Sequence, residues 1–180
     1  MKNFVGIIGC GLIGGKRAAA LSKGSLLAVA DVNIKKAEAL ADKYSDPKSV
    51  KVYPTWQTIL QDNRINVVVV STSNQDLALI TKSALESGKH VLVEKPAARS
   101  VGELEALIQA QEKSDNLKLG IGFNHRFHPA IWKAKELVKQ GAIGKLMMIR
   151  GRYGHGGRLG YNNEWRAKSD LSGGGELHDQ

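Results

Sequence analysis

The stretch FVGIIGCGLIG, residues 4–14, decides the fold of this protein. Its apolar start is typical of a buried strand, and the residues after it follow helical spacing. Between them, Gly9, Gly11 and Gly14 form the pattern G-x-G-x-x-G. The first glycine of this pattern permits a sharp turn, the second lets the backbone approach a pyrophosphate, and the third allows the helix to pack closely on the strand. The stretch therefore predicts a dinucleotide-binding turn.

A helix that begins at this turn has backbone amides without partners at its N-terminus, and its dipole attracts negative charge there. We therefore expect the phosphate contacts of the segment to come from Gly9, Gly11, Leu12, Ile13 and Gly14. A plain glycine turn without a ligand is the alternative interpretation.

Asp31 ends the second apolar run, roughly 20 residues after the glycines, where a carboxylate can accept hydrogen bonds from both hydroxyls of the adenosine ribose. The 2′-phosphate of NADP would bring negative charge against Asp31. Neither Val32 nor Asn33 supplies the arginine that NADP enzymes often place here. The sequence thus favours NAD as the cofactor, with NADP as the alternative. A helix cap before Ile34 is the alternative role for Asp31.

Short apolar runs alternate with segments of helical spacing up to residue 122, which is typical of a parallel sheet covered by helices. We predict strands at 4–8, 26–30, 50–53, 67–71, 90–94 and 117–122, and helices at 14–22, 34–43, 55–61, 77–87 and 100–113. Such a sheet is complete for dinucleotide binding. The predicted fold class is α/β, a Rossmann-type doubly wound parallel sheet in a domain of residues 1–122.

Residues 123–180 are expected to begin a C-terminal α+β domain for substrate binding and oligomerisation. We predict a helix at 129–139, a strand at 145–153, and a loop rich in glycine, asparagine and arginine through Gly175. These are only the first elements of a domain, so we expect a truncated chain with an incomplete second domain.

Composition argues against several classes of partner. The 26 Lys and Arg residues exceed the 17 Asp and Glu residues to give a net charge of +9, but they are scattered singly, so we expect no nucleic-acid partner. No apolar run approaches the roughly 20 residues of a membrane span, so we expect no membrane partner. The N-terminus has no apolar stretch or cleavage site of a secretory signal, which favours a cytoplasmic protein.

Two further residue types carry no predicted chemistry. Cys10 is the only cysteine, and backbone geometry explains its place in the glycine turn, so we expect no reactive role. The histidines have no metal-ligand spacing with Asp, Glu or Cys, and we predict no metal; those considered are His125, His128, His155 and His178.

After the fifth predicted strand stands Glu94-Lys95-Pro96. Here the chain resembles the glucose-fructose oxidoreductase and myo-inositol dehydrogenase (Gfo/Idh/MocA) family, which has an E-K-P motif at this place. The resemblance covers the whole chain, through Thr72 and Asn74, Asn124-x-Arg126-Phe127, Trp165-Arg166, and Gly173 to Gly175 leading to Asp179. It implies further cofactor contacts, beyond the glycine turn and Asp31, at Ser71, Thr72, Asn74, Glu94, Lys95, Asn124, Trp165 and Arg166. Pairing with a nearby cation is the alternative for Glu94.

Two departures from the family pattern are visible. Many members have T-P-N-x-x-H where this chain has Thr72, Ser73, Asn74 and then Leu77, so the contacts on the nicotinamide side differ here. The family's active-site motif is Asp-x-x-x-His, whose histidine would lie three residues beyond Gln180. The family's second domain is mostly an antiparallel sheet that carries much of the subunit interface. The resemblance therefore implies a homo-oligomer for the full-length protein and an inactive chain here.

Oxidation of a carbinol requires a base or proton relay near the hydroxyl as hydride leaves. Lys95 and Asp179 are the catalytic candidates in this sequence. Pro96 restricts Lys95 to extended geometry, and a cis bond there is one way to aim the amine. The resemblance implies that the missing histidine is the direct base, with Lys95 and Asp179 positioning the substrate. A solvated surface lysine is the alternative interpretation of Lys95.

The remaining polar residues suggest where a substrate would bind. A loop of polar and aromatic residues could hold a sugar by hydrogen bonds and ring stacking; its members are Tyr153, His155, Arg158, Tyr161 and Asn162. We expect substrate contacts from Lys95, Arg126, Tyr153, Tyr161 and Asp179. Structural hydrogen bonding is the alternative for Asn124 and Arg126. Trp165 and Arg166 suit ring stacking and a phosphate contact, with a core tryptophan beside a surface arginine as the alternative.

The sequence thus predicts an NAD(P)-dependent oxidoreductase. It would transfer a hydride between the nicotinamide and a carbinol carbon of a sugar, sugar derivative or cyclic polyol. Two alternatives come from the same resemblance. One is a glycosidase that uses NAD transiently without net redox change, and the other is a non-catalytic regulator that senses NAD or a sugar.

Overall fold

The computed structural model describes residues 3–44, 50–114, 116–152 and 159–174. Two compact units are present, one of Met1–Gly122 with Trp165–Gln180 and the other of Phe123–Glu164. Within the described residues, no helix has the length and apolar character needed to cross a membrane.

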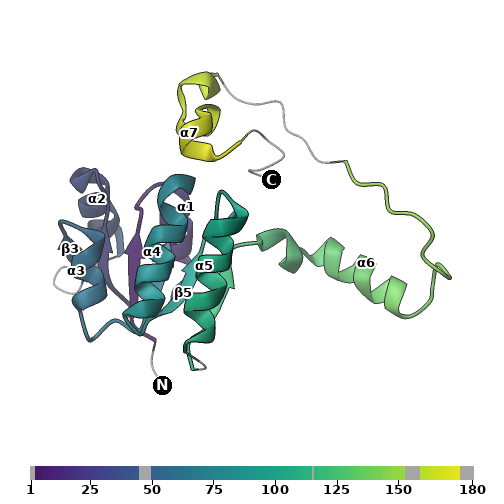
Figure 1. Cartoon of the computed structure of the whole chain (residues 1–180), viewed down its shortest axis with the longest axis horizontal. Helices are drawn as coiled ribbons and strands as arrows, with labels where there is room; N and C mark the ends of the chain where they lie inside the picture. Colours follow the sequence, from purple (N-terminus) through teal and green to yellow (C-terminus); the bar gives the residue numbers. More distant parts are fainter. Residues whose placement is uncertain (1–2, 45–49, 115, 153–158, 175–180) are drawn as a thin grey trace. The chain divides into compact units, whose positions relative to one another are not determined.

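A six-stranded parallel sheet forms the centre of the first unit (Figure 1). Its strands are β1 (Val5–Ile8), β2 (Leu26–Ala30), β3 (Lys51–Tyr53), β4 (Val67–Val70), β5 (His90–Val93) and β6 (Leu119–Ile121). They lie in the order β3-β2-β1-β4-β5-β6, and every neighbouring pair is parallel. The predicted Rossmann-type fold class is confirmed.

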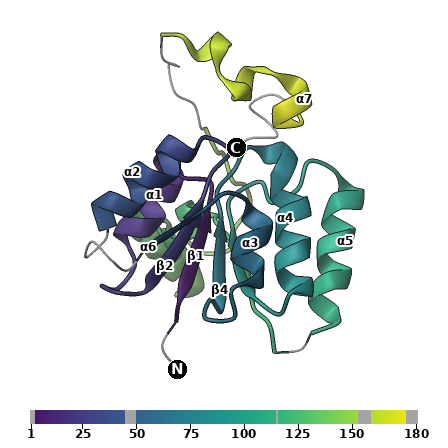
Figure 2. The same ribbon diagram turned by 90° about the vertical axis from the view of Figure 1, so that its left-hand side faces the viewer.

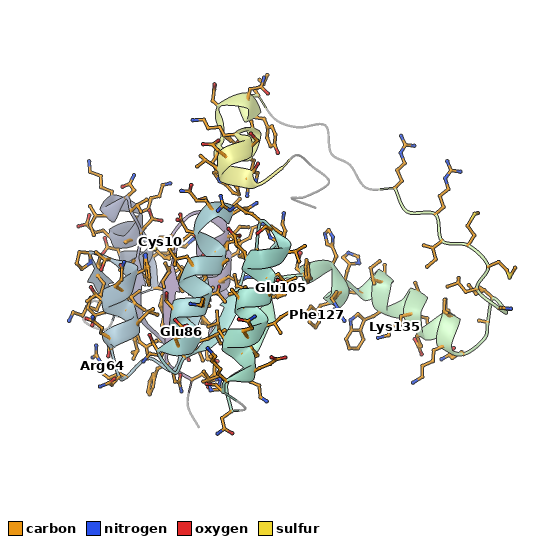
Figure 3. The ribbon with its side chains drawn as sticks, in the orientation of Figure 1. Cys10, Arg64, Glu86, Glu105, Phe127 and Lys135 are labelled. Carbon is orange, nitrogen blue, oxygen red and sulfur yellow. The ribbon has the colours of Figure 1, made fainter. Side chains whose placement is uncertain are left out.

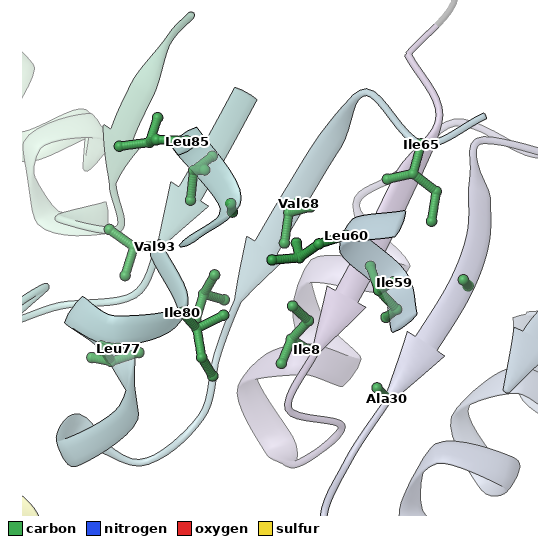
Figure 4. Packing of buried hydrophobic residues seen from close by; sticks show 14 of the residues in the cluster. Ile8, Ala30, Ile59, Leu60, Ile65, Val68, Leu77, Ile80, Leu85 and Val93 are labelled. Carbon is green, nitrogen blue, oxygen red and sulfur yellow. The ribbon is translucent and has the colours of Figure 1, made fainter. Parts of the chain in front are cut away.

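Helices cover both faces of this sheet, as Figure 2 shows. The helices that pack on it are α1 (Leu12–Ala19), α2 (Ile34–Tyr44), α3 (Trp56–Gln61), α4 (Asn74–Glu86) and α5 (Val101–Glu112). On one face, Ile7, Val29 and Val69 pack with buried residues of α1 and α2. On the other, Ile8 and Val68 pack with residues of α3, α4 and α5 (Figure 4). Both faces are therefore buried, which explains the almost continuous apolar runs of the strands.

Local sequence signals mark the start of α5 and the end of α4 as expected. Ser100 accepts a hydrogen bond from the amide of Glu103 at 3.2 Å, so the predicted cap of α5 forms. The Glu103 carboxylate accepts a hydrogen bond from the amide of Arg99 at 2.7 Å. In a standard capping box it would accept from the amide of the N-cap residue, Ser100, one residue later. Gly88 follows α4 with φ of 75°, and the amide of Lys89 donates to Ala84 as in a Schellman motif.

Two predicted helix starts were wrong by two or three residues. The helix expected from Gly14 begins at Leu12, because the glycine turn itself winds into the first helical turn, where the amide of Gly15 donates to Gly11. The helix expected from Leu77 begins at Asn74, a polar residue that is buried in the first turn. The apolar pattern marks only where a helix contacts the core, so it placed both starts too late.

The second unit contains η1 (Asn124–Phe127), α6 (Pro129–Lys139) and η2 (Tyr161–Asn163). The His128 side chain accepts from the amide of Ala130 at 3.2 Å and caps α6, whose predicted bounds are confirmed. The strand predicted at 145–153 was wrong, since its described residues, 145–152, form no strand. A strand is stable only when a neighbour pairs with its backbone, and none of the described strands pairs with this segment.

Candidate functional site

The site is built at the carboxyl ends of β1 and β4, where the order of the strands along the sheet reverses. β1 pairs with β2 on one side and with β4 on the other, so Ile8 lies opposite both Ala30 and Val70. In open α/β sheets this switch point is where ligands bind. The chain places Gly9 directly after β1 and Ser71 directly after β4.

The turn after β1 depends on two glycines. Gly9 has φ of +92°, and a Cβ on it would lie 2.5 Å from the backbone of Ser71. A Cβ on Gly14 would lie 2.1 Å from the Gly9 oxygen, far inside contact distance. The Ser71 hydroxyl donates to that same oxygen at 2.7 Å and closes the arrangement. These residues therefore hold α1 tightly against the ends of two strands.

Gly11 is different, because among the described residues no atom beyond its own chain neighbours and helix backbone lies within 4 Å of the position that a Cβ on it would take. It is the N-cap of α1, without a capping side chain and without an acidic residue in the first turn. Leu12 beside it is 70% exposed. An open approach to uncapped helical amides is what a pyrophosphate requires, so these residues fit a dinucleotide.

Asp31 is held at the end of β2 by two backbone amides. The amide of Cys10 donates to its Oδ2 at 2.7 Å, and the amide of Asn33 donates to its Oδ1 at 2.8 Å. The first bond ties the carboxylate directly to the glycine turn. The Asn33 side chain accepts a hydrogen bond from the amide of Lys35 at 3.2 Å, in the first turn of α2. The carboxylate therefore stands beside the turn, as a ribose-binding residue would.

Cys10, labelled in Figure 3, is a buried thiol whose Sγ lies 3.5 Å from the Ala30 oxygen. Burial, and then the negative charge of Asp31, raise the pKa of this thiol to about 12. The thiol is therefore protonated at neutral pH and a poor nucleophile, in line with the sequence expectation.

The Glu94-Lys95-Pro96 segment forms a tight turn after β5. The amide of Glu94 continues the ladder to Val70 at 2.9 Å, and its carbonyl accepts from the amide of Ala97 at 3.0 Å. The peptide bond between Lys95 and Pro96 is cis, as the sequence suggested. Ala97 is fully buried with φ of 73°, which is unusual for alanine. The turn that carries Lys95, itself half-buried, is thus fixed in the core at both ends.

Sequence reasoning missed Arg17, which is part of this site. Its Nε donates to Oε1 of Glu94 at 2.5 Å, and the two side chains are 28% and 12% exposed. The available signal was the helical spacing from Gly14, because positions 17 and 18 lie on the same side of a helix as position 14.

After β4, two side chains that were predicted to contact the cofactor donate hydrogen bonds within the protein. Thr72 Oγ1 donates to the Ser73 oxygen at 3.2 Å. Asn74 is 2% exposed, and its Nδ2 donates to the Ser172 oxygen at 2.9 Å. Asn74 therefore holds the segment of η3 (Trp165–Ala167) and α7 (Ser169–Ser172) to α4.

This segment carries the predicted pair Trp165 and Arg166. The Arg166 guanidinium lies 4.4 Å from the centre of the Trp165 ring, which is a stacked cation–π geometry. A second tie holds the segment, because Arg99 donates to the Asp170 oxygen at 3.1 Å. The pair is thus fixed on the first unit.

The remaining predicted residues belong to the second unit or lie outside the described residues. Asn124, Arg126 and Tyr161 belong to the second unit, where the Arg126 oxygen accepts from the Trp132 ring at 2.7 Å. Tyr153 and Asp179 lie outside the described residues, as do His155, Arg158 and His178. Within the described part of the chain, no three His, Cys, Asp or Glu side chains are grouped to hold a metal ion.

Comparison with known families gives matches along the chain. A model described as "Oxidoreductase family, NAD-binding Rossmann fold" (GFO_IDH_MocA) matches residues 4–123. A second, described as the GFO/IDH/MocA C-terminal domain, matches residues 131–180.

Curated relatives and solved structures point the same way. An inositol 2-dehydrogenase of Salmonella typhimurium is 30% identical over 152 residues, covering 82% of this chain and 45% of the relative. A levoglucosan dehydrogenase of Pseudarthrobacter phenanthrenivorans is 31% identical over 193 residues, covering 99% and 48%. A levoglucosan dehydrogenase structure, in complex with NADH and levoglucosan, has a TM-score of 0.88 at 29% identity and covers 99% of this chain and 50% of that one. This chain spans about half the length of these relatives.

Proposed function

Because the chain belongs to the oxidoreductase family with an NAD-binding Rossmann fold, we propose that the whole protein is an NAD-dependent dehydrogenase of sugars, sugar derivatives or cyclic polyols. The observation that carries the proposal is the position of two turns at the carboxyl ends of two parallel strands that are separated by a single strand. The glycine turn follows β1, and the Lys95 turn follows β5, with only β4 between these strands. Relatives named for inositol and levoglucosan oxidation support the substrate class.

The residues of the first unit divide the binding of the dinucleotide between them. The amides at the N-terminus of α1 would bind the pyrophosphate beside Gly11. Asp31 would accept hydrogen bonds from the adenosine ribose, and its charge disfavours a 2′-phosphate. Bound NAD supplies a hydride acceptor for the carbinol carbon.

Lys95 would hold the substrate hydroxyl and help to move its proton as hydride leaves the same carbon. The turn around it fixes the backbone on both sides, so the amine would approach the substrate from a defined position. We propose that Asp179 assists Lys95. We also propose that Ser71, Thr72, Glu94, Asn124, Trp165 and Arg166 contact the cofactor, and that Arg126, Tyr153 and Tyr161 contact the substrate.

Asn74, whose Nδ2 donates to the Ser172 oxygen, also remains a proposed cofactor contact. A second domain beginning at residue 123, a homo-oligomeric full-length protein and a cytoplasmic location remain proposals from the sequence. Size measurement of the full-length protein and cell fractionation test the last two.

The proposed function is tested by offering the full-length protein NAD with a panel of sugars, nucleotide sugars and inositols. We expect formation of NADH, in equal amount to a ketone product, with at least one member. The absence of NADH with the whole panel would contradict the proposal. Cleavage of glycosides without net NADH would identify the transient-redox glycosidase instead.

A further inference from the structure

One ion pair joins α1, the helix whose N-terminus is proposed to bind the cofactor (the cofactor helix), to the turn that carries Lys95. Both Nε and Nη2 of Arg17 lie 2.5 Å from the same oxygen, Oε1 of Glu94. Arg17 comes from α1, which begins at the glycine turn, and Glu94 follows β5. The pair therefore connects two functional segments that are 77 residues apart in sequence.

Gly122, directly after β6, leaves the space that this pair occupies. A Cβ on Gly122 would lie 2.7 Å from Oε2 of Glu94 and 3.1 Å from Nη2 of Arg17. The carboxylate is thus confined by Arg17 on one oxygen and by the Gly122 backbone near the other. With a side chain only 12% exposed, Glu94 has little freedom to take another position.

The backbone of Glu94 transmits this restraint to Lys95. Its amide is bonded to Val70 in the sheet, and its carbonyl closes the turn with Ala97. Lys95 is the next residue along the chain, inside that turn. A displaced Glu94 side chain would leave a largely buried carboxylate without its partner, and the turn would have to adjust to rehydrate it.

We propose that Arg17 is a positioning residue, which holds the Lys95 turn in register with the cofactor helix by fixing the Glu94 carboxylate. The inference rests on the proposed function, because it assigns Lys95 its role there. A direct phosphate contact from Arg17 is the alternative, but two of its nitrogens are already directed to Glu94.

The test compares Arg17→Ala, Arg17→Lys and Glu94→Gln in the full-length protein. We expect Arg17→Ala to lower kcat roughly 10- to 100-fold through misplacement of Lys95. The dissociation constant for NAD, measured by calorimetry, should change less than about threefold, because the residues proposed to bind NAD are not altered. Arg17→Lys should recover part of kcat, and hydrogen exchange at the Ala97 amide should be faster in Arg17→Ala. The double variant Arg17→Ala/Glu94→Gln should lose little more than either single variant.

Two further variants separate this role from a general loss of stability. Arg64→Ala removes an arginine whose side chain is 62% exposed from its ion pair with Asp62, outside the site, and should keep wild-type kcat. Gly122→Ala keeps both charges and crowds the pair, so it should lower kcat in the same direction as Arg17→Ala.

If the wild-type protein turns over substrate and Arg17→Ala has the same kcat, the inference is overturned and the proposed function still holds. A loss of NAD affinity equal to the loss of kcat would also overturn it, in favour of a phosphate contact. A wild-type protein that oxidises no member of the panel contradicts the proposed function itself.

Discussion

The Nδ2 atom of Asn74 donates to the backbone oxygen of Ser172 at 2.9 Å, across 98 residues of sequence. Asn74 lies in the first turn of α4, beside the carboxyl end of β4, and its side chain is buried. A residue expected at the cofactor is therefore also the tie that holds the Trp165–Arg166 segment to the Rossmann unit. Arg99 supplies the second tie, through the Asp170 oxygen.

Asn74→Ala should loosen the segment of residues 165–174, because the Ser172 oxygen loses its buried donor. A buried polar group left without a partner costs about 1–3 kcal/mol. Limited proteolysis and hydrogen exchange of the full-length protein should both report faster opening in this segment. Gln75→Ala, an exposed change at the next position, is the matched control. Equal protection in the two variants would show that the tie has no role.

Gly14→Ala should prevent correct packing of α1, since the new Cβ would lie 2.1 Å from the Gly9 oxygen. Crowding of this kind costs about 1–3 kcal/mol or more. Gly15→Ala is the control, because alanine favours a helix and, in the described part of the chain, no atom beyond its own helix and chain neighbours lies within 4 Å of the added Cβ. Thermal unfolding should show a lower Tm for Gly14→Ala and an equal or higher Tm for Gly15→Ala. A normal Tm for Gly14→Ala would contradict the packing described.

Lys95→Ala in the full-length protein should abolish turnover and leave NAD affinity nearly intact. The reason is that Lys95 acts on the substrate hydroxyl, whereas the glycine turn and Asp31 hold most of the cofactor. Steady-state kinetics with calorimetry of NAD binding gives both quantities. Substantial turnover in Lys95→Ala would remove Lys95 from the chemistry.

Cys10 should make stability fall at alkaline pH. Burial raises the pKa of its thiol to about 12 in the folded chain, whereas the unfolded thiol ionises near its ordinary value of 9.0. Between these values the unfolded state loses a proton that the folded state keeps, so the free energy of unfolding decreases as pH rises. Cys10→Ala should show a smaller decrease over this range. The native thiol should also react slowly with a thiol reagent that labels it at once in denaturant, and rapid native labelling would contradict its burial.

The parts of the site that could be predicted from sequence are those encoded locally. Gly9, Gly11 and Gly14 define one turn by their spacing, and Asp31 follows from the end of the next strand. The bonds from Arg17 to Glu94 and from Asn74 to Ser172 join distant segments, so no local pattern signals these partners, although helical spacing places Arg17 on the same side of its helix as Gly14. The helix starts at Leu12 and Asn74 were placed too late for a related reason: the first two residues of α1 belong to the glycine turn, and the first three of α4 are polar.

The strand expected at 145–153 shows the other limit of sequence reasoning. Its apolar residues match strand propensity. A strand also needs a neighbouring strand to pair with its backbone, and the fold of the chain decides whether one is there. In the first unit, each predicted strand had its neighbour in the same sheet, and all of them were confirmed within two residues at either end.

Calorimetric titration of the full-length protein with NAD, and in parallel with NADP, measures whether the glycine turn and Asp31 bind a dinucleotide. We predict saturable heat with NAD and weaker binding of NADP, because the 2′-phosphate would meet the carboxylate of Asp31. Folded protein that releases no heat with either dinucleotide would contradict the proposed dinucleotide site.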